Sequence, residues 1–157
     1  MRPQEGFSLI ELLIVVAIIG IIAAIAIPNL IASRRAANEG SAQSSLRTIQ
    51  SSEAAYRATA GNGDYGNLAA LQAHNFVGTD LGGGAKSGYS FTATPDNTLA
   101  IPNFFVFGVP AVVAPIIRTG NRSFTIAEDG VLRVKVTDTG PTDHTDAVDD
   151  ASWPAVN

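Results

Sequence analysis

Glu11 is the residue with the clearest potential for chemistry, because it is a carboxylate inside a long apolar segment. It follows the residues GFSLI at positions 6–10, and the 22 positions from Leu12 to Ser33 carry no charge. A charge in apolar surroundings is costly, so it is a functional candidate unless it reaches water. Glu11 therefore either extends its carboxylate to a polar surface or pairs with a cation.

Other candidates for catalytic chemistry are weak. The two histidines, His74 and His144, are isolated in the sequence, and neither an HExxH nor a GxSxG motif occurs. The glycines at 82–84 lack the Lys-Ser/Thr pair and the preceding strand of a phosphate loop. We therefore expect a protein that is not an enzyme.

The C-terminal segment, residues 137–157, is acidic and offers a possible cation site. Hard cations bind several carboxylate and carbonyl oxygens, so a bound calcium ion is one hypothesis, although the spacing does not fit an EF-hand loop. Its ligands would be Asp143, Asp146, Asp149 and Asp150. The alternative is a solvated acidic tail, held to the head by Trp153. We expect no other cofactor.

Composition excludes several further classes. The 157 residues have a formal net charge of −4, and Arg34-Arg35 is the one adjacent basic pair, so nucleic-acid binding by a charged face is not indicated. Cysteine is absent, which excludes disulfides, thiolate nucleophiles and cysteine metal sites.

The apolar run is long enough to cross a membrane. As a helix, residues 12–33 span about 33 Å, and a hydrocarbon core is about 30 Å thick. The Arg34-Arg35 pair can stop the run at a membrane surface. One interpretation is a secretory signal cleaved after Ala24-Ile25-Ala26, and another is a plain membrane anchor.

The N-terminal pattern also resembles the signature of type IV prepilins and pseudopilins over roughly the first 35 residues. The shared features are a short polar leader, Gly6 before Phe7, Glu11 at a fixed offset, and Gly20 and Pro28 within the apolar helix. This combination is highly specific for the family.

The resemblance implies cleavage between Gly6 and Phe7 by a membrane-embedded prepilin peptidase, followed by N-methylation of the Phe7 amine. It also implies assembly into a helical homo-oligomeric filament with these helices at its core. The leader departs from the family pattern, since Arg2 and Glu5 nearly cancel where the family is more basic.

Physical chemistry gives the same residues roles. Gly6 has no side chain, so a peptidase can approach its backbone closely. Pairing Glu11 with the Phe7 amine of a neighbouring subunit neutralises both charges and sets the axial register. Pro28 weakens the helix because it lacks a backbone donor, and Gly20 is a second weak point. The resemblance suggests that this segment partly unwinds on leaving lipid.

The resemblance also implies partners and a location. The precursor is expected to be a single-pass inner-membrane protein that meets an assembly platform and its ATPase, and later an extracellular pilus or a periplasmic pseudopilus subunit. A structural pilus subunit is the main hypothesis, and a pseudopilin of a type II secretion system is the alternative. The lack of cysteine disfavours a major pilin, whose head often has a disulfide. A signal peptide or anchor on an extracytoplasmic binding domain is a lesser alternative.

The expected fold class is α+β and pilin-like. Residues 1–6 are a leader, and residues 7–60 form one long helix, ended by the glycines that follow. Its apolar half, 7–33, protrudes as a transmembrane or filament-core segment, and its amphipathic half, 34–60, packs on a small antiparallel sheet. Residues 61–157 form the head with the acidic tail.

The amphipathic half has a narrow apolar stripe at Ala42, Leu46, Ile49 and Tyr56, which Glu53 interrupts. A short helix is expected near Leu68–His74, a flexible turn at Gly82–Gly84, and a turn at Pro95–Asn97. Three or four strands are expected, at Tyr89–Ala93, Phe104–Val109, Ser123–Ile126 and Val131–Val136.

A proline and a glycine affect what is expected of these strands. Pro110 argues against a clean central strand at 104–109. Asp129-Gly130 predicts a tight hairpin between the last two strands. Alternation directs one set of side chains to one face of that hairpin: Phe124, Ile126, Leu132, Val134 and Val136.

Replacing Gly6 by a bulky residue should leave uncut precursor in the membrane, because a side chain at this position blocks the approach of the peptidase to the backbone. The measurement is an immunoblot of membrane fractions that separates precursor from mature chain. Normal processing of the variant would contradict cleavage between Gly6 and Phe7.

Overall fold

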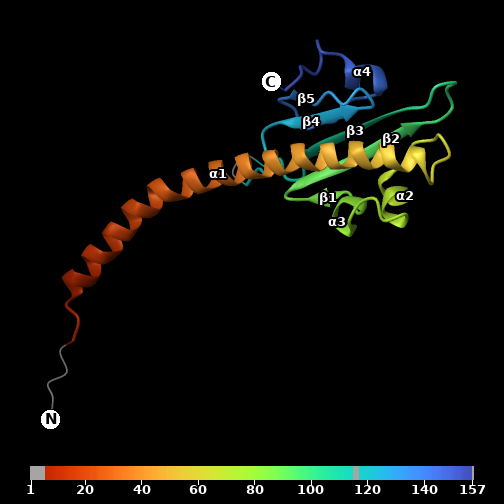
Figure 1. Cartoon of the computed structure of the whole chain (residues 1–157). Helices are drawn as coiled ribbons and strands as arrows, with labels where there is room; N and C mark the ends of the chain where they lie inside the picture. Colours follow the sequence, from red (N-terminus) through yellow and green to blue (C-terminus); the bar gives the residue numbers. More distant parts are fainter. Residues whose placement is uncertain (1–5, 115–116, 157) are drawn as a thin grey trace. The chain divides into compact units, whose positions relative to one another are not determined.

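The computed structural model describes residues 6–114 and 117–156, which form a long helix followed by a small antiparallel sheet (Figure 1). This is the α+β fold expected from the sequence. The chain divides into two units, one up to Arg34 and one from Arg35 onward. Helix α1 contributes residues to both units.

Helix α1 runs from Leu9 to Ala58 and contains Pro28 without interruption. In the first unit its large apolar side chains are exposed, by between 50% at Val15 and 82% at Leu9. Exposure of so much apolar surface to water is unfavourable, so this part of α1 requires lipid or other apolar surfaces around it.

The C-terminal end of α1 is set by local backbone chemistry. The Gly61 N–H donates to the Tyr56 carbonyl at 2.8 Å, and Gly63 donates to the Arg57 carbonyl at 3.0 Å. Asn62 and Gly63 have φ angles of 51° and 103°, left-handed values that a continuing helix cannot contain.

Five strands form one antiparallel sheet, in which neighbours in sequence are neighbours in space (Figure 1). They are β1 (Ala85–Lys86), β2 (Tyr89–Asp96), β3 (Asn103–Pro110), β4 (Ser123–Ala127) and β5 (Arg133–Lys135). The expected count of three or four strands was too low, because two-residue β1 is too short to show alternation. Successive connections lie at alternate ends of the sheet.

Two expectations about proline were wrong. Strand β2 continues through Pro95, where a turn was expected. Strand β1 pairs only with Tyr89 and Ser90, so Pro95 lies where β2 is an edge and needs no second ladder bond. Strand β3 is the central strand despite Pro110, because this proline is its last residue and removes no bond from its middle.

The main core lies between the second part of α1 and one face of the sheet. Ala42, Leu46 and Ile49 are at most 1% exposed there. Helix α2 (Leu68–Ala73) is capped by Asn67, whose side chain accepts the Ala70 N–H at 2.9 Å. The core also contains Tyr65, Leu68, Leu71, Tyr89, Phe91, Phe104, Phe124 and Ile126.

The tail is folded onto the sheet, so its description as a solvated segment was incomplete. Helix α4 (His144–Val148) buries Ala147 against Phe105 and Ala127, and Trp153 is 1% exposed. Every residue of β4 is consequently buried. The sequence did not predict α4 because five residues carry too short a helical pattern.

Two smaller expectations were also wrong. Gly82 ends a short helix, α3 (Thr79–Gly82), where a flexible turn was expected. Val136 is 81% exposed, because β5 ends at Lys135 and the alternation does not continue beyond it. Gly130 has a φ of 73°, as the predicted turn requires, but β5 begins only at Arg133.

Glu53 continues the buried stripe of α1 and is 0% exposed. Its Oε2 accepts the Gly66 N–H at 2.9 Å, whereas Oε1 has no hydrogen-bond partner among the described residues. Burial raises the pKa of Glu53 to about 7, and the Gly66 hydrogen bond opposes this shift. The folded head therefore favours the uncharged carboxyl group.

Glu53→Gln should stabilise the full chain above pH 7 by up to about 3 kcal/mol, because the wild type must ionise a buried carboxyl group there. In the wild type, the contribution of Glu53 to the free energy of unfolding is fully present below pH 4.5, the ordinary pKa of the group. It is lost as the pH rises through the folded-state pKa of about 7. Urea unfolding in detergent at acidic and alkaline pH measures the difference. A stabilisation by Glu53→Gln that is equal at acidic and alkaline pH would contradict the raised pKa of Glu53.

Candidate functional site

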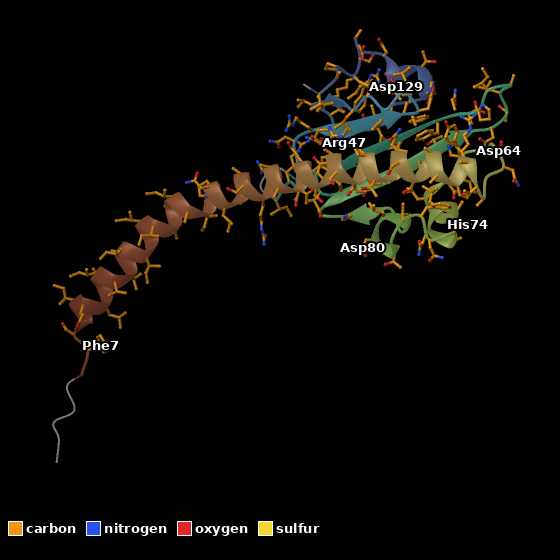
Figure 2. All side chains as sticks on the ribbon, in the orientation of Figure 1. Phe7, Arg47, Asp64, His74, Asp80 and Asp129 are labelled. Atoms are coloured by element: carbon orange, nitrogen blue, oxygen red, sulfur yellow. The ribbon has the colours of Figure 1, made fainter. Side chains whose placement is uncertain are left out.

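The predicted processing site lies in a short non-helical segment before α1. Gly6, Phe7 and Ser8 precede the helix, and the Ser8 carbonyl accepts the Leu12 N–H at 3.2 Å. Phe7 is 84% exposed (Figure 2), and a Cβ added at Gly6 would meet nothing within 4 Å. Substitution at Gly6 therefore leaves the fold undisturbed, while residues 1–5 of the expected leader lie outside the described residues.

Glu11 is exposed in the first turn of α1, where the helix dipole favours a negative charge. Within residues 6–114 and 117–156, no basic side chain forms an ion pair with it. Any cation that neutralises Glu11 in apolar surroundings comes from outside this set of residues. That Glu11 sets the axial register of neighbouring subunits stays a prediction.

The apolar surface at the start of α1 has a hollow of about 530 Å³. Phe7 and Ser8 line part of it, and the first turns of α1 line the rest. Its lining residues are Phe7, Ser8, Leu9, Leu12, Leu13 and Val16. This surface can receive apolar side chains from another helix or lipid chains.

Helix α1 is, among the described residues, the one helix long and apolar enough to cross a membrane by length and composition. Its most apolar 18-residue stretch has a mean hydropathy of 3.1 and none of it is buried. Gly20 and Pro28 are both helical. The missing N–H of Pro28 leaves the helix one hydrogen bond short, and flexibility there stays a prediction.

The four aspartates of the calcium hypothesis have protein partners. Asp143, Asp146 and Asp149 accept backbone N–H groups, and Asp150 pairs with Arg133 at 2.8 Å. Nowhere in the described ranges do three His, Cys, Asp or Glu side chains gather as a metal site would require. A calcium ion at these aspartates stays a hypothesis, and the structure offers no cluster in its support.

The histidines occupy ordinary structural positions. His144 Nε2 lies 2.8 Å from Glu128 Oε1, an ion pair when the ring is protonated. His74 packs edge-on against the Tyr56 ring, with centroids 5.5 Å apart. Sequence reasoning missed the His144–Glu128 pair because the residues lie on different elements.

A second buried carboxylate on α1, Glu39, was also missed. It is 6% exposed. Its Oε1 accepts the Asn121 N–H at 2.8 Å, and its Oε2 lies 2.7 Å from Arg122 Nη2. The signal was present in the sequence, because Glu39 and Glu53 continue the three- and four-residue spacing of the apolar stripe. Glu39 fixes α1 to the loop before β4.

Comparisons with known proteins address the N-terminal pattern directly. Residues 1–27 match the family model described as the prokaryotic N-terminal methylation motif. The chain is 32% identical to the type IV major pilin protein PilA of Myxococcus xanthus over 129 residues. The matched stretch covers 82% of this chain and 54% of that relative. Over most of its length the chain is therefore similar to a type IV pilin.

Two other pilus proteins match over shorter stretches. The type IV wide pilus major component PilA4 of Thermus thermophilus is 64% identical over 39 residues, which is 25% of this chain and 30% of that protein. A fimbrial protein of Pseudomonas aeruginosa is 76% identical over 29 residues, 18% of this chain and 19% of its own length. The chain thus spans about half or less of the lengths of these relatives. No solved structure matches it.

Proposed function

We propose that this chain is a structural subunit of a type IV pilus-like filament. In this proposal it is made as a single-pass precursor in the inner membrane, cleaved between Gly6 and Phe7, methylated at Phe7 and assembled through α1. The mature subunit then lies in an extracellular pilus. Its work is association, with no catalytic step.

The observation that carries the proposal is Glu11 on an apolar helix surface with no basic partner among the described residues. Cleavage before Phe7 releases an amine, a cation of the kind Glu11 needs. An ionised carboxylate in apolar surroundings costs about 3 kcal/mol at the centre of a membrane helix. Pairing with the Phe7 amine of a neighbouring copy removes this cost only at the correct axial position.

The proposal also assigns roles to machinery outside the chain. A prepilin peptidase acts at the exposed Gly6–Phe7 bond, and an assembly platform with its ATPase moves the apolar segment from lipid into the filament. Support comes from the match to the methylation motif and from the exposed apolar side chains between Leu9 and Leu30.

The alternative, a pseudopilin of a type II secretion system, shares the N-terminal requirements. The pilus assignment is preferred because a relative that matches 82% of this chain is named a major pilin. A signal peptide on a separate binding domain does not account for the position of Glu11.

Glu11→Ala should leave cleavage normal but reduce filament yield. Loss of about 3 kcal/mol of pairing per subunit weakens each docking step by roughly 100-fold. The measurements are an immunoblot for the mature chain and a count of surface filaments by electron microscopy. Wild-type filament yield from this variant would remove the register role.

Glu5→Ala is the matched control. It also removes a carboxylate, but one that the proposed cleavage separates from the mature chain. Filament yield should therefore match the wild type once processing is complete. A loss as large as that of Glu11→Ala would contradict the proposed role of Glu11.

A further inference from the structure

The connection between α1 and α2, residues 59–67, contacts the buried carboxyl group of Glu53. The Gly66 N–H donates to Glu53 Oε2 at 2.9 Å, and this hydrogen bond is itself buried. Glu53 Oε1 has no hydrogen-bond partner among the described residues. The connection therefore offers the carboxyl group one donor and leaves its second oxygen without one.

The rest of the connection is held mainly by hydrogen bonds from two side chains. Arg57 donates from Nε to the Gly63 carbonyl and from Nη1 to the Tyr65 hydroxyl, each at 2.9 Å. Asn97 exchanges hydrogen bonds with the Tyr65 backbone at 3.0 and 2.9 Å, and the Tyr65 ring packs against Phe104 with centroids 4.5 Å apart. By contrast, β3 is bonded to a strand on each side. Opening the connection alone therefore costs less than unfolding the sheet.

The start of the connection has the backbone of a hinge. Asn62 and Gly63 have φ angles of 51° and 103°. Gly61 and Gly63 have no Cβ, so rotation of the backbone around them meets little steric resistance. Figure 1 shows the connection turning back from the end of α1 toward α2. A change in dihedral angles at residues 61–63 is enough to move Gly66 away from Glu53.

The charges around Glu53 leave burial as the dominant influence on it. The ionisable side chains on the surrounding elements are Tyr56 and Arg57 of α1, Asp64 and Tyr65 of the connection, His74 after α2 and Asp96 at the end of β2. Arg57 lies over the Tyr65 ring, 4.8 Å from its centroid, and His74 packs on Tyr56. Figure 2 labels Asp64 and His74. Burial raises the pKa of Glu53 to about 7, and the hydrogen bond from Gly66 opposes this shift.

We propose that residues 59–67 are a pH-sensitive latch, closed over Glu53 in acid and opened locally at Gly66 as the solution becomes neutral. A buried carboxylate requires several donors, and the closed latch supplies one. Opening admits water to both carboxyl oxygens, while the sheet stays folded. The latch belongs to the head, so its action does not depend on the proposed filament.

The direction and size of the effect follow from the pKa of Glu53 in the two states. It is about 7 in the closed latch and returns to the ordinary value of 4.5 when the group meets water. Below pH 4.5 the group is protonated in both states, so pH has no effect. Between pH 4.5 and 7 only the open latch ionises, and its population rises about tenfold per pH unit. Above pH 7 both states ionise, and the rise levels off at roughly 300-fold in total.

Amide hydrogen exchange of the full chain in detergent, followed by mass spectrometry at a series of pH values, measures this opening. After correction for intrinsic exchange rates, fragments covering residues 59–67 should show an opening constant that rises roughly 300-fold from pH 4.5 to above pH 7. Glu53→Gln should remove this rise, because the amide does not ionise. Asp64→Asn is the matched control, since it removes an exposed carboxylate from the latch and should keep the wild-type profile.

Low concentrations of urea separate opening of the latch from unfolding of the whole head, which also exposes Glu53 and has the same pH dependence. Exchange through the latch should change little with urea, because little surface becomes exposed, whereas exchange in β4 should accelerate. Equal urea dependence of the two segments would overturn the proposal. A wild-type profile that is flat between pH 4.5 and 7, or a Glu53→Gln profile as steep as the wild type's, would overturn it as well.

Discussion

An ionised carboxylate is unfavourable in apolar surroundings unless a cation or several donors meet it. Helix α1 carries three carboxylates in this situation, and each is treated differently. Glu39 is paired with Arg122 and the Asn121 N–H. Glu53 has a pKa raised to about 7 and one hydrogen bond. Glu11 has neither device among the described residues and is exposed. This difference separates the part of α1 that packs on the head from the part for which assembly is proposed.

The second part of α1 is therefore specified by polar as well as apolar contacts. Ala42, Leu46 and Ile49 supply the buried surface, but apolar contacts alone allow a helix to shift along a sheet. Glu39 bonds only when residues 121–122 are in place, and Glu53 bonds only when Gly66 is in place. These two contacts lie four turns apart on one face. Together they fix both ends of the packed segment against residues distant in sequence.

Sequence reasoning succeeded where local chemistry decides the structure. The helix stop at residues 61–63, the short helix at Leu68 and the positive φ at Gly130 all follow from neighbours in sequence. It failed where partners are distant. Pro95 is acceptable in β2 only because β1 is too short to reach it, and α4 folds only because the sheet offers it a surface. The ion pair of Glu39 could not be predicted, because Arg122 lies opposite it only in the folded head. At the N-terminus, the roles of Gly6, Phe7 and Glu11 stay predictions from their pattern, since no described residue forms an ion pair with Glu11.

The C-terminal segment shows how the head is closed without a disulfide. Val134 donates to the Pro154 carbonyl at 2.9 Å, and Val156 donates to the Leu132 carbonyl at 2.8 Å, so the tail extends the β5 edge. Arg133 pairs with Asp129 and Asp150 at 2.8 Å each. Trp153 is buried, and the Lys135 ammonium lies 5.5 Å from its ring centroid. Covering the edge of β5 removes a surface on which another chain could pair by strand addition.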